Sequence, residues 1–213
     1  MNARQHATHT WLVQPILPVV VIDSVDQGLQ IAEGLLQGGI SQIEITLRTP
    51  AALPAMQAIA RAFPEMKLSA GTVLRAEQFD QCAEAGATLF ISPGLTEALA
   101  QHALDGHFNW VPGTATASEM MHALELGFDL VKFFPAMAAG GPKALEGIAT
   151  PLSGVRVVPT GGITLANLKD WKPIRALAAV GGTWLTQGLG QVACIRDEVA
   201  ARSAAALNAW NDA

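Results

Sequence analysis

The chain has 213 residues, of which 50% are hydrophobic and 15% are charged, and its formal net charge is −5. This length and apolar content exclude a disordered chain and suffice for one large core, close to the lower limit for a single α/β barrel. The negative charge and the absence of a Lys- or Arg-rich block argue against binding to nucleic acid or to an anionic membrane surface.

The first residues contain no apolar signal core, and residues 1–15 are expected to form an arm or a helix. The apolar run at residues 11–22 is interrupted by two prolines and a glutamine, so it is too short to cross a bilayer. Cys82 and Cys194 lack metal-ligand spacing. We interpret them as buried or half-buried thiols of a protein in a reducing cytoplasm.

Short apolar runs alternate with longer amphipathic segments along the chain. The runs predict about eight strands, at residues 16–22, 42–47, 67–71, 89–92, 110–112, 130–134, 155–159 and 176–180. The longer segments predict helices at residues 25–37, 51–62, 76–85, 96–104, 117–126, 142–149, 165–171 and 195–210. Regular alternation of this kind implies parallel strands covered by helices.

Two α/β architectures fit this alternation. A doubly wound open sheet usually has fewer strands and often carries a glycine fingerprint in its first turn, which here reads IDSVDQG (residues 22–28). No linker or low-complexity stretch divides the chain. We therefore predict a single (β/α)8 TIM barrel over residues 1–213, with a closing helix within residues 191–213.

The strand predicted at residues 42–47 alternates between apolar and polar side chains. Ile43 and Ile45 lie on one face, whereas Glu44 and Arg48 belong to the other. In a barrel the apolar face packs against helices, so the polar face should point inward near the C-terminal mouth. The alternative is an ordinary strand with a half-exposed polar face, but that face is normally covered in a parallel sheet.

A lysine interrupts the apolar strand predicted at residues 130–134. Lys132 lies between Val131 and Phe133, and a charged ammonium is costly in such surroundings. Burial favours the neutral amine, which is the form that attacks a ketone. Lys132 is therefore a candidate nucleophile; the alternative is a structural lysine that pairs with a carboxylate.

Two Gly-Gly pairs follow the last two predicted strands. They occur in PTGGI (residues 159–163) and VGGTW (residues 180–184), beside the hydroxyls of Thr160 and Thr183. Loops at these positions of a barrel often bind phosphate, and glycine lets backbone N–H groups approach it. The pairs indicate a phosphate site, with two tight turns and no ligand as the alternative.

Six motifs in collinear order resemble the KDPG/KHG aldolases, the class I pyruvate aldolases of the Entner–Doudoroff pathway. The motifs are IEITLRT (43–49), SAGTVL (69–74), FISPGLT (90–96), VPGTATASE (111–119), VKFFPA (131–136) and PTGGI (159–163). The resemblance runs from Ile16 to Trp184. It implies a barrel enzyme without metal or cofactor, and because family members are usually trimers we expect a homotrimer.

The resemblance also implies roles for single residues. Lys132 matches the Schiff-base lysine, and Glu44 matches the general acid/base that moves protons. The residues that match substrate-binding groups are Arg48 and Thr72 at the pyruvate carboxylate, Thr160 near the same carboxylate, Pro93 and Phe134 as apolar walls, and Gly161, Gly162, Gly181 and Thr183 as a phosphate cradle.

The implied reaction is the reversible cleavage of 2-dehydro-3-deoxy-6-phosphogluconate into pyruvate and glyceraldehyde 3-phosphate, with 4-hydroxy-2-oxoglutarate as a further substrate. Two alternatives are the galactonate analogue as substrate and a non-catalytic paralogue that binds a phosphorylated ligand. Thr160 favours the gluconate series, because galactonate relatives typically have Val there. The lysine–glutamate pair argues against a pure binding protein.

Two positions depart from the family pattern. Thr183 stands where the family usually has Ser, so the hydroxyl is retained and a methyl is added. Met137 stands where the family often has Glu. We therefore expect a more apolar loop at the aldehyde end of the substrate.

Overall fold

The computed structural model describes residues 11–212, so the part of the expected N-terminal arm at residues 1–10 lies outside the described residues. Within the described range nine strand segments pair in parallel. They are β1 (Ile16–Val20), β2 (Gln42–Thr46), β3 (Lys67–Gly71), β4 (Leu89–Ile91), β5 (Trp110–Val111), β6 (Gly113–Thr114), β7 (Leu130–Phe133), β8 (Arg156–Pro159) and β9 (Val180–Gly182).

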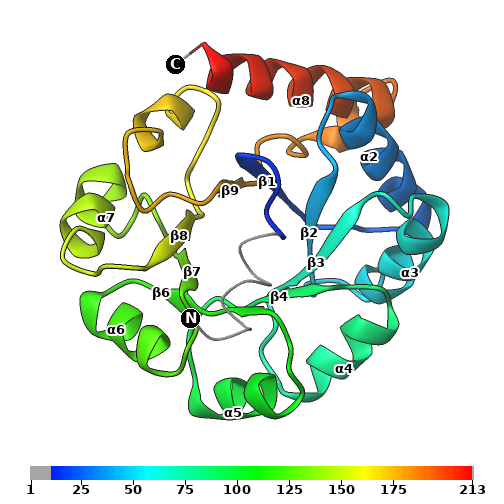
Figure 1. Ribbon diagram of the computed structural model, residues 1–213. Helices are drawn as coiled ribbons and strands as arrows, with labels where there is room; N and C mark the ends of the chain where they lie inside the picture. Colours follow the sequence, from blue (N-terminus) through cyan, green and yellow to red (C-terminus); the bar gives the residue numbers. More distant parts are fainter. Residues whose placement is uncertain (1–10, 213) are drawn as a thin grey trace.

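The strands form a closed ring (Figure 1). Six of them follow the order β5-β4-β3-β2-β1-β9, and the other three follow the order β6-β7-β8. Pro112 alone separates β5 from β6, and a bridge between Thr160 and Gly181 joins the end of β8 to β9. With β5 and β6 taken as one strand, the ring has the eight strands of a (β/α)8 barrel. The predicted barrel is confirmed, and a doubly wound open sheet is excluded.

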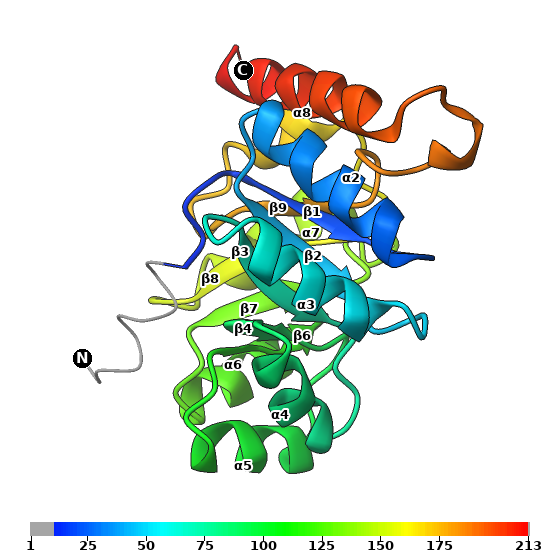
Figure 2. The same ribbon diagram turned by 90° about the vertical axis from the view of Figure 1, so that its right-hand side faces the viewer.

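Helices surround the ring on its outside (Figure 1). They are α2 (Val25–Gln37), α3 (Ala52–Ala62), α4 (Glu77–Glu84), α5 (Glu97–Asp105), α6 (Ala117–Glu125), α7 (Gly141–Ala149), α8 (Ile195–Asn211) and the short 3-10 helices η1 (Leu168–Trp171) and η2 (Leu189–Gln191). The first and last, α2 and α8, lie side by side (Figures 1 and 2). Among residues 11–212, none of the helices combines the length and hydrophobicity of a membrane span.

Side chains cap the first turns of several of the predicted helices. The Thr116 hydroxyl accepts the Glu119 backbone N–H, and the Glu119 carboxylate accepts the N–H of Thr116 in return. This capping box begins α6. The backbone N–H of Ala115, which donates to the same carboxylate, holds the pKa of Glu119 below its usual value.

The helix predicted at residues 165–171 is wrong in extent, because only the four residues of η1 are helical. The Asn167 side chain accepts the backbone N–H of Thr164 at 2.8 Å and donates to the Gly162 carbonyl at 3.2 Å. These bonds hold the preceding residues in a turn, and Pro173 disfavours helical continuation through the residue before it.

The prediction of the last strand at residues 176–180 is also wrong in position, because the strand lies closer to the C-terminus. The structure pairs this stretch with β8 only at the bridge between Leu177 and Val157, and β9 proper begins at Val180. Gly181 and Gly182 therefore lie in β9, not in a loop after it. Both glycines pair with β1, and Gly181 also forms the bridge to Thr160 at the end of β8.

Alternation along the strands divides the apolar residues between two cores. The larger core lies between the ring and the helices. The smaller core fills the barrel interior and consists of Trp11, Leu17, Leu89, Ile91, Val111, Leu130 and Val158. In β7, Leu130 belongs to the interior core while Val131 and Phe133 belong to the outer one, so Lys132 faces the interior beyond Leu130.

Candidate active site

A lysine and a glutamate meet inside the ring. Lys132 is the third residue of β7, and Glu44 is the third residue of β2. The distance from Lys132 Nζ to Glu44 Oε1 is 2.9 Å, and the two side chains are 8% and 1% exposed. The pair is therefore a buried ion pair that spans the barrel interior.

A glycine on the neighbouring strand makes room for the Glu44 carboxylate. A Cβ on Gly71 of β3 would overlap with Glu44 Oε1 and lie 2.6 Å from its Cγ. The second carboxylate oxygen, Oε2, is buried and accepts no hydrogen bond from the described residues. Glu44 thus holds the lysine with one oxygen, and its other oxygen retains its capacity to accept a hydrogen bond.

Of the two residues expected as apolar walls, Phe134 lies beside Lys132 and Pro93 lies beside the strand neighbour of the lysine. Nζ lies 5.5 Å from the centroid of the Phe134 ring. Gly113 of β6 is the register partner of Lys132, and a Cβ there would overlap with the carbonyl of Pro93. Thr114 Oγ1 donates to the Lys132 carbonyl at 3.1 Å and so ties β6 to β7 at the lysine.

The hydroxyl expected near the keto-acid carboxylate lies where β8 ends. Thr160 is 4% exposed, and its side chain occupies the space that a Cβ on Gly181 would need. A bulkier residue at 181 would therefore displace Thr160. Gly182 is likewise required by packing, because the Trp184 ring occupies the space of its missing Cβ.

The Gly-Gly loop after β8 adopts a backbone that favours glycine. Gly161 has φ 106° and Gly162 has φ 75°, both in the left-handed region. The Gly161 carbonyl accepts the backbone N–H of Met137 at 3.0 Å, which ties this loop to the one that follows β7. A Cβ on Gly162 would lie 2.8 Å from the Met137 Cβ, so Met137 packs against Gly162.

Arg48, Thr72 and Thr183 each follow the carboxyl end of a strand by one or two residues. The carboxyl ends of parallel strands share one mouth of the barrel, where active sites of this fold lie. Arg48 is exposed. Thr72 has φ 60°, a left-handed conformation that costs a non-glycine residue about 1–3 kcal/mol. Thr183 Oγ1 accepts the Gln187 side-chain amide at 2.8 Å.

Gly71 and Gly113 are features of the site that the sequence prediction missed. Each admits another chemical group at close range, the Glu44 carboxylate in one case and the Pro93 peptide in the other. A glycine inside a predicted strand is a signal for such an approach, and Gly71 carries it within the strand predicted at residues 67–71, whereas Gly113 follows the strand predicted at residues 110–112. The signal does not name the approaching group, because that group comes from another strand.

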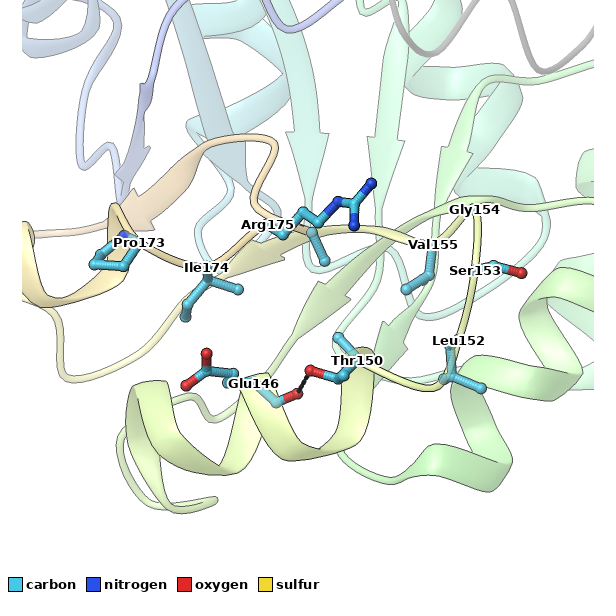
Figure 3. A pocket seen from close by; sticks show the side chains of 11 residues that line it. Glu146, Thr150, Leu152, Ser153, Gly154, Val155, Pro173, Ile174 and Arg175 are labelled. Atoms are coloured by element: carbon cyan, nitrogen blue, oxygen red, sulfur yellow. Dashed lines mark hydrogen bonds between the residues drawn. The ribbon is translucent and has the colours of Figure 1, made fainter.

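A separate cavity of about 380 Å³ lies between α7 and residues 173–176 (Figure 3). Its strand-side walls, Val155 and Ala176, precede β8 and β9, whereas the predicted site residues lie toward or beyond the carboxyl ends of the strands. The cavity therefore belongs to the opposite end of the barrel. Within residues 11–212, no cluster of three or more His, Cys, Asp or Glu side chains could hold a metal ion.

The geometry has counterparts in known proteins. Residues 9–197 match the protein family described as KDPG and KHG aldolase. The KHG/KDPG aldolase of Escherichia coli (strain K12) is 44% identical over 171 residues, which are 80% of each chain.

Two solved structures are also similar over nearly the whole chain. The 2-keto-3-deoxy-6-phosphogluconate aldolase of Zymomonas mobilis ZM4, with 3-phosphoglycerate, is 36% identical at a TM-score of 0.87 and covers 95% of this chain and 94% of that one. The KDPG aldolase of Legionella pneumophila, with pyruvate captured as a covalent carbinolamine intermediate, is 34% identical at a TM-score of 0.88 and covers 95% and 98%. The chain described here belongs to the KDPG and KHG aldolase family.

Proposed function

We propose that this protein is a class I aldolase that reversibly cleaves 2-dehydro-3-deoxy-6-phosphogluconate into pyruvate and glyceraldehyde 3-phosphate. The observation that carries the proposal is the buried pair of Lys132 and Glu44, with 2.9 Å between Nζ and Oε1. Membership of the family makes the protein an aldehyde-lyase. The captured carbinolamine of the Legionella relative supports covalent chemistry on a lysine.

Stability alone explains the ion pair poorly. Transfer of two charges into a protein interior costs several kcal/mol each, and their attraction often fails to exceed that cost. An apolar pair of similar volume would hold the barrel at least as well. The retention of Lys132 and Glu44 at a buried position therefore favours a chemical role over a structural one.

The first half of the reaction joins the substrate to the lysine. Glu44 accepts a proton from the Lys132 ammonium, and the free amine attacks the C2 keto carbon. Glu44 then returns a proton to the departing hydroxyl, so the carbinolamine loses water and becomes an iminium. One carboxylate serves both transfers because it lies within hydrogen-bond distance of Nζ.

The second half breaks the carbon–carbon bond. Glu44 takes the proton of the C4 hydroxyl, the C3–C4 electrons move into the iminium, and the aldehyde leaves behind an enamine on Lys132. Protonation at C3 and addition of water then release pyruvate and restore the amine. The carboxylate oxygen that no described residue occupies, Oε2, suits the role of acceptor for the C4 proton.

The proposed binding groups orient the two ends of the substrate. Arg48 and Thr72 hold the pyruvate carboxylate with Thr160 nearby, because a guanidinium and hydroxyls complement an anion. At the other end the backbone of Gly161 and Gly162, with Gly181 of β9 and Thr183 directly after that strand, holds the phosphate. Fixing both ends places the keto carbon against Lys132.

Borohydride trapping tests the covalent step. Incubation with pyruvate and borohydride should leave a stable adduct on Lys132, located by peptide mass spectrometry. Lys132→Met should take no label, whereas Lys143→Met, which removes an exposed lysine of α7, should label like the parent. Continued labelling and normal turnover of Lys132→Met would contradict the proposal.

Substrate choice is a second, finer part of the proposal. Thr160, buried against Gly181, supports the gluconate series over the galactonate series, and the glycine loops support a phosphorylated substrate over 4-hydroxy-2-oxoglutarate. We expect kcat/KM to be highest for the gluconate substrate, lower for the galactonate analogue and lowest for 4-hydroxy-2-oxoglutarate. A higher kcat/KM for the galactonate analogue would reverse the assignment.

We also propose that one domain carries the whole activity and that the chain assembles into a homotrimer in the cytoplasm, without nucleic-acid or membrane partners. Val21, Leu74 and Leu165, in the segments that follow β1, β3 and β8, are 39%, 56% and 44% exposed and supply apolar surface for association. The free thiols of Cys82 and Cys194 fit a reducing compartment. Light scattering should give three times the chain mass; a clean monomer would contradict assembly.

A further inference from the structure

Two tryptophans donate hydrogen bonds to hydroxyls at the two ends of β4. Thr88, the residue before the strand, accepts the Trp11 indole N–H at 2.5 Å. Ser92, the residue after the strand, accepts the Trp110 indole N–H at 3.0 Å. The bonds are chemically alike, but the first lies at the amino-terminal end of the barrel and the second at the mouth.

The bond at the mouth continues to another group. Ser92 Oγ donates its own proton to the Gly94 carbonyl at 2.6 Å. Trp110 and Ser92 are each 1% exposed, so water does not compete for these bonds. Edge-to-face contact with Phe128, at 5.0 Å between ring centroids, holds the indole in place.

The anchored turn rests on the strand next to the lysine. A Cβ on Gly113 would lie 2.6 Å from Gly94 N and would overlap with the Pro93 carbonyl. The peptide between Pro93 and Gly94 is thus packed against the Gly113 backbone. Gly113 is in turn the register partner of Lys132. One chain of contacts therefore runs from the indole through the turn to the strand that flanks the amine.

We propose that Ser92 and Trp110 are positioning residues for the aldolase reaction. Their two hydrogen bonds hold the Pro93–Gly94 peptide against Gly113 and so set the wall that faces the keto acid on Lys132. The inference rests on the proposed function, because it assumes that the keto acid is bound there.

Loss of either bond should loosen this wall. Removal of the hydroxyl frees the Gly94 carbonyl to turn. Removal of the indole N–H leaves the Ser92 hydroxyl, which donates to that carbonyl, without the donor that fixes its orientation. The keto acid would then be held less firmly against the amine, and small misplacements of reacting groups have large effects on rate. Both the half-saturating pyruvate concentration and kcat should respond.

The matched comparison is Trp110→Phe against Trp11→Phe, since each removes one indole N–H donor bound to a hydroxyl beside β4. We expect kcat/KM to fall about tenfold in Trp110→Phe and to stay within about twofold of the parent in Trp11→Phe. The melting temperatures of the two variants should fall by similar amounts, so stability would not explain the difference. In borohydride trapping, Trp110→Phe should need several-fold more pyruvate for half-maximal label.

Ser92→Ala provides a second route to the same result if Trp110→Phe folds poorly. Because both residues act through one turn, the double variant should lose little more than either single variant. Equal kcat/KM losses in Trp110→Phe and Trp11→Phe would overturn the positioning role but not the proposed function. The same conclusion would follow if the loss in the double variant equalled the product of the two single losses. A parent chain that takes no label from pyruvate would overturn the proposed function together with it.

Discussion

The two ends of the barrel interior differ in the charge of their side chains. Toward the amino-terminal ends of the strands the interior holds apolar residues, such as Leu17, Leu89 and Leu130. Toward the mouth it holds the ion pair of Glu44 and Lys132. The change occurs within one strand, because Leu130 and Lys132 are two residues apart on the same face of β7.

The contrast separates stability from chemistry. Burial of a Leu or Val side chain contributes about 1.5–3 kcal/mol to folding, whereas a buried ion pair contributes little net stability. One end therefore closes the barrel, and the other can hold groups selected for reactivity. Substitutions at one end of the interior, or outside it, therefore test whether activity and stability respond separately.

The largest effect is expected for Glu44→Gln at the mouth. The amide keeps the shape but cannot accept and return protons, so kcat should fall by about 10²- to 10⁴-fold while pyruvate still binds. Steady-state kinetics and pyruvate binding measure the two quantities. Glu146→Gln on the exposed face of α7 is the control and should keep the parent kcat. An unchanged kcat in Glu44→Gln would remove Glu44 from the mechanism.

Leu130→Ala tests the opposite end. Truncation of this 2% exposed side chain should lower the free energy of unfolding by about 2–5 kcal/mol. Urea denaturation measures the loss. The kcat of the remaining folded enzyme should stay within about twofold of the parent. If Lys132→Met were as destabilising as Leu130→Ala, the separation of the two ends would be wrong.

Met137→Glu tests whether the mouth has separate sides for the phosphate and for the keto acid. Met137 packs over Gly162 and is 41% exposed, so a carboxylate there would lie beside the proposed phosphate site. Because the family often has Glu at this position, the repulsion should be limited to about 1 kcal/mol, which would lower kcat/KM for the phosphorylated substrate about fivefold. Met137→Gln, which adds no charge, is the control. The pyruvate concentration for half-maximal borohydride label should not change; a rise would place Met137 at the keto-acid side instead.

The smallest effect concerns neither end. The distance from His122 Nε2 of α6 to Glu97 Oε1 of α5 is 2.7 Å. This hydrogen bond is the main reason that the pKa of His122 is raised above its ordinary value of 6.5, and Glu125 adds to the rise. A raised histidine pKa gives stability that is present below the unfolded value and is lost as pH rises through the folded value.

The stability difference between the parent and His122→Gln should therefore be larger at about pH 5.5 than at about pH 8.5, by thermal unfolding. The difference should be small, because the pair is exposed to solvent. A larger difference at the alkaline pH would refute the assigned role. The activity of His122→Gln should equal that of the parent, since the pair lies outside the barrel.

Local sequence patterns predicted much of the barrel. Alternation in QIEITLR placed Glu44 on the inner face, and the apolar neighbours of Lys132 marked it as an unusual lysine. Patterns near the end of the chain were less informative. The glycines at 181 and 182 were predicted to follow a strand, whereas they lie inside β9 because β1 pairs with them. Pairing with a distant strand leaves no trace in local periodicity.

The amino-acid sequence by itself determined which residues face the interior, because the two-residue period of a strand is a local property. It also identified the family through six short motifs. Only the tertiary structure decided that Glu44 and Lys132, 88 residues apart, would lie 2.9 Å from each other. That distance depends on the closure of the ring and on the space left at Gly71, both of which result from contacts between strands far apart in the chain.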